Sequence, residues 1–193
     1  MKKYSLHENT ENKKNTEKLA KYVAKIHAQK IDSTEFKKYN AEWVAEQVEK
    51  INDVQTKNDI TLALKTMSQI ESHRVPVKKY SFLAWDISRS DWHQDYKSGG
   101  VGSYAWDIAC IINCANNAQF SKIFLQSYLR HGGEKPTIVG LHTNLYYVQL
   151  MEAIKSHDFE NIMQTTRKII DDTIFKTDLI SHAILIELGI TGY

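Results

Sequence analysis

Apolar residues recur at helical spacing along most of this chain. Between about Asn15 and Gln29, leucine, tyrosine, valine and isoleucine lie on one face of a helical projection and lysines lie on the opposite face. This pattern is typical of an amphipathic surface helix. The same spacing predicts further helices over residues 32–51, 59–71, 104–116, 118–131, 138–152 and 159–170.

Several helix boundaries are marked by residues that stabilise helix ends. Asp32 followed by Glu35 resembles a capping box and predicts the start of the second helix. Ser103 is a suitable N-cap for the helix that follows it. Gly132 and Gly133 predict the end of the 118–131 helix, since glycine readily leaves the helical conformation.

One segment near the middle of the chain has the composition of a strand. Residues 79–85 are rich in aromatic side chains, which favour strands, and a polar, glycine-bearing loop follows over 86–102. With 193 residues, 2 Pro and 8 Gly, the chain fits a single helical domain better than a many-turned β fold. We therefore predict a mainly α fold with one short strand or hairpin near the middle. Residues 1–12 form a polar tail, and residues 13–193 form one helical domain with a strand/loop insert at about 79–102.

The segment over residues 179–188 is apolar on nearly all sides. Such a helix is either buried centrally or covered by another subunit. A second chain or a homo-oligomer that uses the 179–188 helix is therefore one expected kind of partner.

The charge balance disfavours several function classes. Lys and Arg number 25 against 23 Asp and Glu, a formal charge of +2, which is far from the basic excess typical of nucleic-acid binding. No secretory signal and no membrane-length apolar stretch is visible in the sequence. We expect a cytoplasmic protein that binds neither nucleic acid nor membrane, with Cys110 and Cys114 as small apolar residues on one helix face.

The segment from Tyr80 to Asp107 is dense in aromatic and acidic residues. Carboxylates in loops bind divalent cations through oxygen, and aromatic faces hold organic cations. A histidine in such a loop has a protonation state that its neighbours tune. The candidate ligand-binding residues are Trp85, Trp92, His93, Tyr96 and Trp106.

Three stretches, in order, resemble the C-terminal lobe of the aminoglycoside phosphotransferase and choline kinase group, a branch of the protein-kinase-like fold. The helix over residues 19–28 is similar to the one that this family carries after its interlobe hinge, and residues 82–86 resemble its strand ending in a metal-binding acidic residue. Residues 102–109, Gly-Ser-Tyr-Ala-Trp-Asp-Ile-Ala, are similar to its Gly-Asp-Pro-Ala-Tyr/Trp-Asp-Leu-Ala helix start. The resemblance implies a helical, kinase-like C-lobe.

The resemblance leaves the register of the acidic residues open. In one register Ala84 stands where the family has its metal-binding Asp, and a shift of the strand makes Asp86 the metal ligand. In a third, Asp86 and Asp91 have the five-residue separation of the family's catalytic Asp and Asn, and Asp95 is the metal residue. The resemblance thus implies Asp86 and Asp91 as candidate catalytic residues and Asp86 and Asp95 as candidate metal ligands. For Asp107 it implies a structural role, bracing the catalytic loop.

The family's nucleotide-binding lobe and its His-Gly-Asp-x-x-x-x-Asn motif are absent from this sequence. Because phosphoryl transfer depends on positioned phosphates and a metal, the chain is expected not to be catalytic alone. The leading hypothesis is a truncated or degenerate phosphotransferase-like lobe that binds a small cationic ligand or a partner through the acidic aromatic loop. One alternative is an active phosphotransferase with an alcohol group as acceptor, using ATP and Mg²⁺ once another chain supplies the nucleotide lobe. A second alternative is a helical oligomeric interaction protein.

Overall fold

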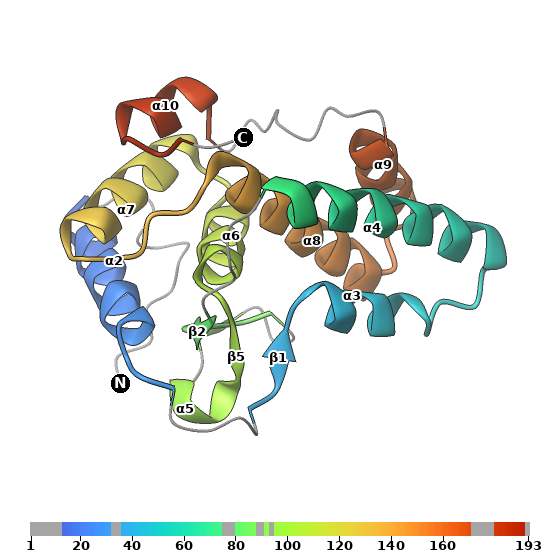
Figure 1. Cartoon of the computed structure of the whole chain (residues 1–193), viewed down its shortest axis with the longest axis horizontal. Coiled ribbons are helices and arrows are strands. Elements are labelled where there is room, and N and C mark those ends of the chain that lie inside the picture. The colour runs from blue at the N-terminus through green and yellow to red at the C-terminus, as the bar shows by residue number, and fades with distance from the viewer. Residues whose placement is uncertain are drawn as a thin grey trace.

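The chain is mainly α-helical, with a small three-stranded sheet at one end (Figure 1). The computed structural model describes residues 13–31, 36–74, 80–87, 91–92, 95–170 and 180–191. The expected polar tail, the capping-box pair Asp32 and Glu35, and His93 lie outside these residues. The predicted mainly α fold with a short strand or hairpin near the middle is confirmed, and the strand β1 at residues 38–39 was not predicted.

The helices pack in two groups around a central helix. On one side α2 packs against α7, and on the other α4, α8 and α9 pack together, while α6 contacts both α7 and α8 (Figure 1). The helices are α2 (Lys13–His27), α3 (Ala41–Val48), α4 (Val54–Arg74), α5 (Tyr96–Gly99), α6 (Tyr104–Ala115), α7 (Ala118–Arg130), α8 (Ile138–Ser156), α9 (Phe159–Ile170) and α10 (His182–Glu187).

The strands form two small sheets below α6. In the first, the order is β1–β5–β2, with β5 parallel to β1 and antiparallel to β2. In the second, β3 and β4 form an antiparallel pair that sets Trp85 opposite Trp92 and Asp86 opposite Asp91. The strands are β1 (Lys38–Tyr39), β2 (Tyr80–Phe82), β3 (Trp85–Asp86), β4 (Asp91–Trp92) and β5 (Val101–Ser103).

Two of the three predicted helix boundaries are confirmed. The Ser103 hydroxyl accepts a hydrogen bond from the Ala105 amide at 3.2 Å at the start of α6, and α7 ends at Arg130, just before the glycine pair. The predicted helix start at Asp32 lies outside the described residues, and the predicted helix over residues 32–51 is wrong at residues 38–39. Residues 38–39 form β1 instead, and Asn40 caps α3 by accepting from the Trp43 amide at 3.0 Å.

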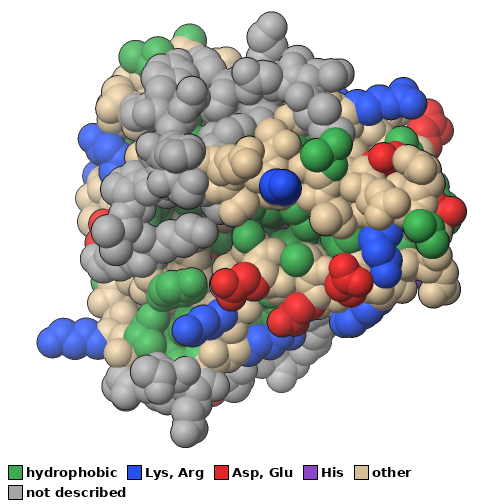
Figure 2. All heavy atoms as spheres, turned by 45° about the vertical axis from the view of Figure 1, so that its right-hand side comes forward, with side chains coloured by type: hydrophobic (Ala, Val, Ile, Leu, Met, Phe, Trp, Pro, Cys, Tyr) green, Lys and Arg blue, Asp and Glu red, His purple; other side chains and the backbone are tan. Residues whose placement is uncertain are grey.

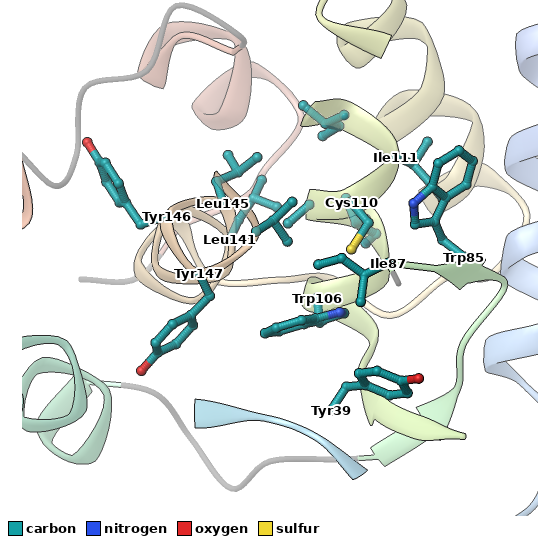
Figure 3. Packing of buried hydrophobic residues seen from close by; sticks show 14 of the residues in the cluster. Tyr39, Trp85, Ile87, Trp106, Cys110, Ile111, Leu141, Leu145, Tyr146 and Tyr147 are labelled. Carbon is teal, nitrogen blue, oxygen red and sulfur yellow. The ribbon is translucent and has the colours of Figure 1, made fainter. Parts of the chain in front are cut away.

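The core is rich in aromatic side chains that converge from separate elements. Trp106 is 1% exposed, and its ring centroid lies 5.9 Å from that of Trp43 and 6.3 Å from that of Tyr147. Figure 3 shows Trp106 of α6 between Tyr39 on one side and Ile87 on the other. This cluster joins the sheet to α3, α6 and α8.

The apolar C-terminal segment is only partly buried within this chain. Ile180, Leu185 and Ile190 are buried, whereas Ile186 on α10 is 56% exposed. Within the part of the chain that the structure describes, α10 therefore has one face in the core and one at the surface.

Candidate functional site

The β3–β4 hairpin carries the acidic residues that the sequence singles out. Asp86 is half-buried on β3, and its partner in the hairpin register is Asp91 on β4. The hairpin follows directly on the turn at Leu83 and Ala84. Whatever fixes this turn also fixes the position of Asp86.

Asp107 fixes that turn through both oxygens of its carboxylate. The Ala84 amide donates to Asp107 Oδ2 at 2.7 Å, and the Trp85 amide donates to Asp107 Oδ1 at 2.8 Å. The Asp107 side chain is fully buried. A buried carboxylate is stable only when it is hydrogen-bonded, and these two amides satisfy most of that requirement. Asp107 thus ties the first turn of α6 to the residue before Asp86.

His27, the last residue of α2, completes the surroundings of Asp107. Its Nε2 lies 2.9 Å from Asp107 Oδ2, and its Nδ1 lies 2.8 Å from the Tyr128 hydroxyl. Because the carboxylate only accepts, we assign the imidazole proton to Nε2. The Tyr128 hydroxyl then donates to Nδ1. Burial raises the pKa of Tyr128 far above its usual range, and the nearby Asp107 carboxylate adds to the rise, so this hydroxyl keeps its proton.

The candidate aromatic ligand residues lie in different environments. Trp85 and Trp106 are buried, whereas Tyr96 on α5 is half-buried with its ring centroid 5.6 Å from that of Phe82. The structure describes the backbone of Trp92 in β4, and His93 lies outside the described residues. The structure therefore brings Trp85 and Trp106 into the core, and the ligand-binding roles of these residues stay predictions.

The candidate metal ligands do not gather into a three-residue cluster. Asp95 caps the short helix α5, where its Oδ1 accepts from the Lys97 amide at 3.1 Å. Within the described residues, no group of three or more His, Cys, Asp or Glu side chains is placed to hold a metal ion. A metal role for Asp86 and Asp95, like a catalytic role for Asp86 and Asp91, stays a prediction.

A pocket of about 560 Å³ opens beside the hairpin. Ile87, the residue after Asp86, forms one wall, and the remaining walls come from the end of α3, the α3–α4 connection, the end of α8 and the start of α9. The sequence does not reveal this pocket, because its lining residues come from three separated stretches of chain, 43–53, Ile87 and 151–162. Only the apolar stripes of α3 and α9 hint at it, and such stripes normally indicate core.

Comparison with known proteins identifies no relative. No protein-family model, curated protein or solved structure matches this chain. The resemblance to the phosphotransferase group therefore rests on the residues quoted above. Over the residues that the structure describes, no helix has the length and apolarity needed to cross a membrane.

Proposed function

We propose that this chain is a phosphotransferase-like helical lobe that binds a small organic cation at the β3–β4 hairpin and does not transfer phosphate alone. The observation that carries the proposal is the pair of hydrogen bonds from the Ala84 and Trp85 amides to Asp107. By the resemblance, an acidic residue at this position of the motif is expected to brace the catalytic loop. The contacts place Asp107 beside the turn that leads into Asp86.

The charge of the hairpin favours a cation as the ligand. The register pairs the backbone positions of Asp86 and Asp91 across the two strands, so the hairpin brings two acidic residue types to one place, and acidic residues attract cations rather than anions. The isolated chain is expected not to use ATP, because its sequence shows no match to the nucleotide-binding lobe with which the family holds the phosphates.

Calorimetry with a matched pair of small molecules tests the binding part. We expect choline to bind more tightly than 3,3-dimethyl-1-butanol, its neutral isostere, because only choline carries the charge that Asp86 attracts. Asp86→Asn should weaken choline binding by about tenfold or more, while Asp59→Asn on α4 should leave it unchanged. Equal affinity for choline and 3,3-dimethyl-1-butanol would overturn the proposed cation site. Undiminished choline binding by the Asp86→Asn variant would overturn it as well.

An ATP-consumption assay tests the second part. The isolated chain with ATP and Mg²⁺ should show no turnover, with or without choline or an amino sugar. Steady turnover by the isolated chain would contradict the proposal.

The same hydrogen bonds favour a second candidate, an active phosphotransferase completed by a nucleotide lobe on another chain. In that case Asp86 or Asp91 acts as the base, and Asp95 or Asp86 holds Mg²⁺. A glycine-rich hairpin and a strand lysine encoded next to this gene would identify the missing lobe. Mixing the two proteins should then start ATP consumption, and Asp86→Asn should abolish it; an inactive mixture would exclude this candidate.

A further inference from the structure

We propose that the pocket beside Ile87 binds a neutral apolar molecule, a hydrocarbon or aromatic body with one uncharged hydrogen-bonding group. This site is separate from the cation site proposed at the hairpin and takes a different class of ligand. The inference does not depend on the phosphotransferase-like role, because it rests on the lining of the pocket alone.

The walls of the pocket suit an apolar body. Its volume of about 560 Å³ falls in the usual range for small-molecule sites, which are mainly hydrophobic with a few polar groups. The apolar side chains of the lining are Trp43, Ile51, Ile87, Met151, Ile154, Phe159 and Ile162.

Phe159 leaves apolar surface in contact with water at the mouth of this pocket. It stands at the start of α9, and 55% of its surface is exposed. A ligand in the pocket would cover part of this side chain. Removing apolar surface from water favours binding, so Phe159 contributes to the affinity for an apolar body.

The Lys and Asp side chains of the lining are already engaged within the chain. Lys50 donates at 2.7 Å to the side-chain oxygen of Gln47, and the Asp53 carboxylate accepts from the Thr56 amide at 2.7 Å. Lys155 also has an interaction partner within the chain. An ionic head group loses hydration on entering an apolar pocket, and here it would have to compete with these contacts for a countercharge. The lining therefore favours a neutral ligand over an anion or a cation.

The helix ends around the pocket also favour neither sign of charge. The C-terminal ends of α3 and α8, which favour cations, meet the N-terminal ends of α4 and α9, which favour anions. These opposed dipoles offset one another. Figure 2, which views the molecule from the side of α3, α4 and α9, shows a recess with hydrophobic side chains bordered by acidic and basic ones.

The side chains of Asn52 and His157 complete the lining, and both are exposed. An amide and an imidazole can each donate and accept a hydrogen bond. They suit a hydroxyl, carbonyl or amide group on the ligand. The pocket thus combines an apolar body site with hydrogen-bonding groups that need no charge on the ligand.

Three probes with one tail and different heads test the charge preference. In calorimetry with the full chain, 1-octanol should bind more tightly than either octanoate or octylammonium. If either ion binds as tightly as 1-octanol, or if none of the three binds, the proposal is wrong.

A shorter alcohol tests whether the tail is buried. We expect 1-octanol to bind about tenfold more tightly than 1-hexanol, because its two additional methylene groups leave water for the apolar pocket. Equal affinities of the two alcohols would overturn the assignment of an apolar body site.

A matched pair of variants locates the site. Phe159→Ala should weaken 1-octanol binding by about threefold. Leu62→Ala on α4 is the control, because Leu62 is 54% exposed and lies outside the lining. Both side chains are more than half exposed, so both variants should fold, which circular dichroism checks. Unchanged binding in Phe159→Ala would overturn the location, and so would an equal loss in Leu62→Ala.

Discussion

At the scale of single residues, Asp107 holds the start of the hairpin in place. Its carboxylate accepts from two amides and from His27 in a fully buried position. Removing it leaves three donors without an acceptor, and each buried unsatisfied group costs about 1–3 kcal/mol. We expect Asp107→Ala to lower the free energy of unfolding by about 3–5 kcal/mol, measured by urea denaturation. Glu160→Gln on the exposed face of α9 is the control, and a loss below about 1 kcal/mol in Asp107→Ala would contradict this role.

Gly133 leaves room for the ring of Tyr128, whose hydroxyl is hydrogen-bonded to His27. A Cβ at this position would overlap the ring of Tyr128, which is fully buried and bonded to His27. At Gly132 the added Cβ would meet nothing, although its φ of +82° disfavours other residues.

Gly133→Ala should therefore cost about 2–3 kcal/mol through overpacking, and Gly132→Ala about 1 kcal/mol through backbone strain. Urea denaturation of the two variants provides the measurement. A larger loss of unfolding free energy in Gly132→Ala than in Gly133→Ala would mean that the Tyr128 side chain moves aside at little cost.

The sequence could indicate a structural role for Asp107, but it could not indicate the groups to which Asp107 is hydrogen-bonded. The resemblance implies a bracing role for Asp107, and the structure shows which amides it accepts from. The contact with His27 joins residues 80 positions apart, and helical periodicity carries no information on such pairs. The helix-period pattern places His27 at the end of α2 without indicating what it touches.

At the scale of elements, α3 shows how a short strand redirects the chain. Lys38 pairs with Val101 and Tyr39 with Gly102 in a parallel ladder, so the helix begins only at Ala41. A strand of two residues has no visible period, and its partner lies more than sixty positions away. Helical spacing alone therefore did not separate β1 from α3 within the predicted helix over residues 32–51.

The start of α3 at Asn40 can be tested directly through its N-cap. The Asn40 side chain accepts from the Trp43 amide at 3.0 Å, and an N-cap of this type contributes about 1 kcal/mol. Asn40→Ala should speed amide hydrogen exchange over residues 41–48, with Asn40→Asp close to the original protein. Unchanged exchange in Asn40→Ala would show that packing alone holds the helix start.

At the scale of the whole molecule, one thiol and three phenols are buried or half-buried and keep their protons. Burial raises the pKa of the Cys110 thiol well above its usual value, and it also raises the pKa of Tyr104, Tyr128 and Tyr146. Unfolded thiols and phenols lose their protons near pH 8.5 and pH 10, respectively. The unfolded chain therefore releases protons that the folded chain retains.

The sign of the pH dependence follows from these raised pKa values. Their contribution to stability is complete below about pH 8.5 and is lost as the pH rises further. Urea denaturation at about pH 7, 9 and 10.5 should show a falling free energy of unfolding, and Cys110→Ala should remove the first part of the fall. A flat profile up to about pH 10.5 would contradict the burial of these groups.

The fold class could be predicted because long amphipathic periods dominate the sequence, and the helices from α6 to α9 begin and end close to their expected positions. The pocket beside Ile87 could not be predicted, since it exists only where three separate segments meet. Sequence periodicity indicates single helices and strands, whereas a cavity between them depends on how they pack together.

The contact between α2 and α7 has a consequence for synthesis on the ribosome. The apolar face of α2 is covered by α7, and His27 meets Tyr128, which is 101 positions later. At about 5–20 residues per second, translation of that interval takes roughly 5–20 s. During this time the nascent chain carries an uncovered apolar helix, which is the kind of surface that chaperones bind. A slow codon run before α7 should lengthen that exposure and lower the yield of folded protein.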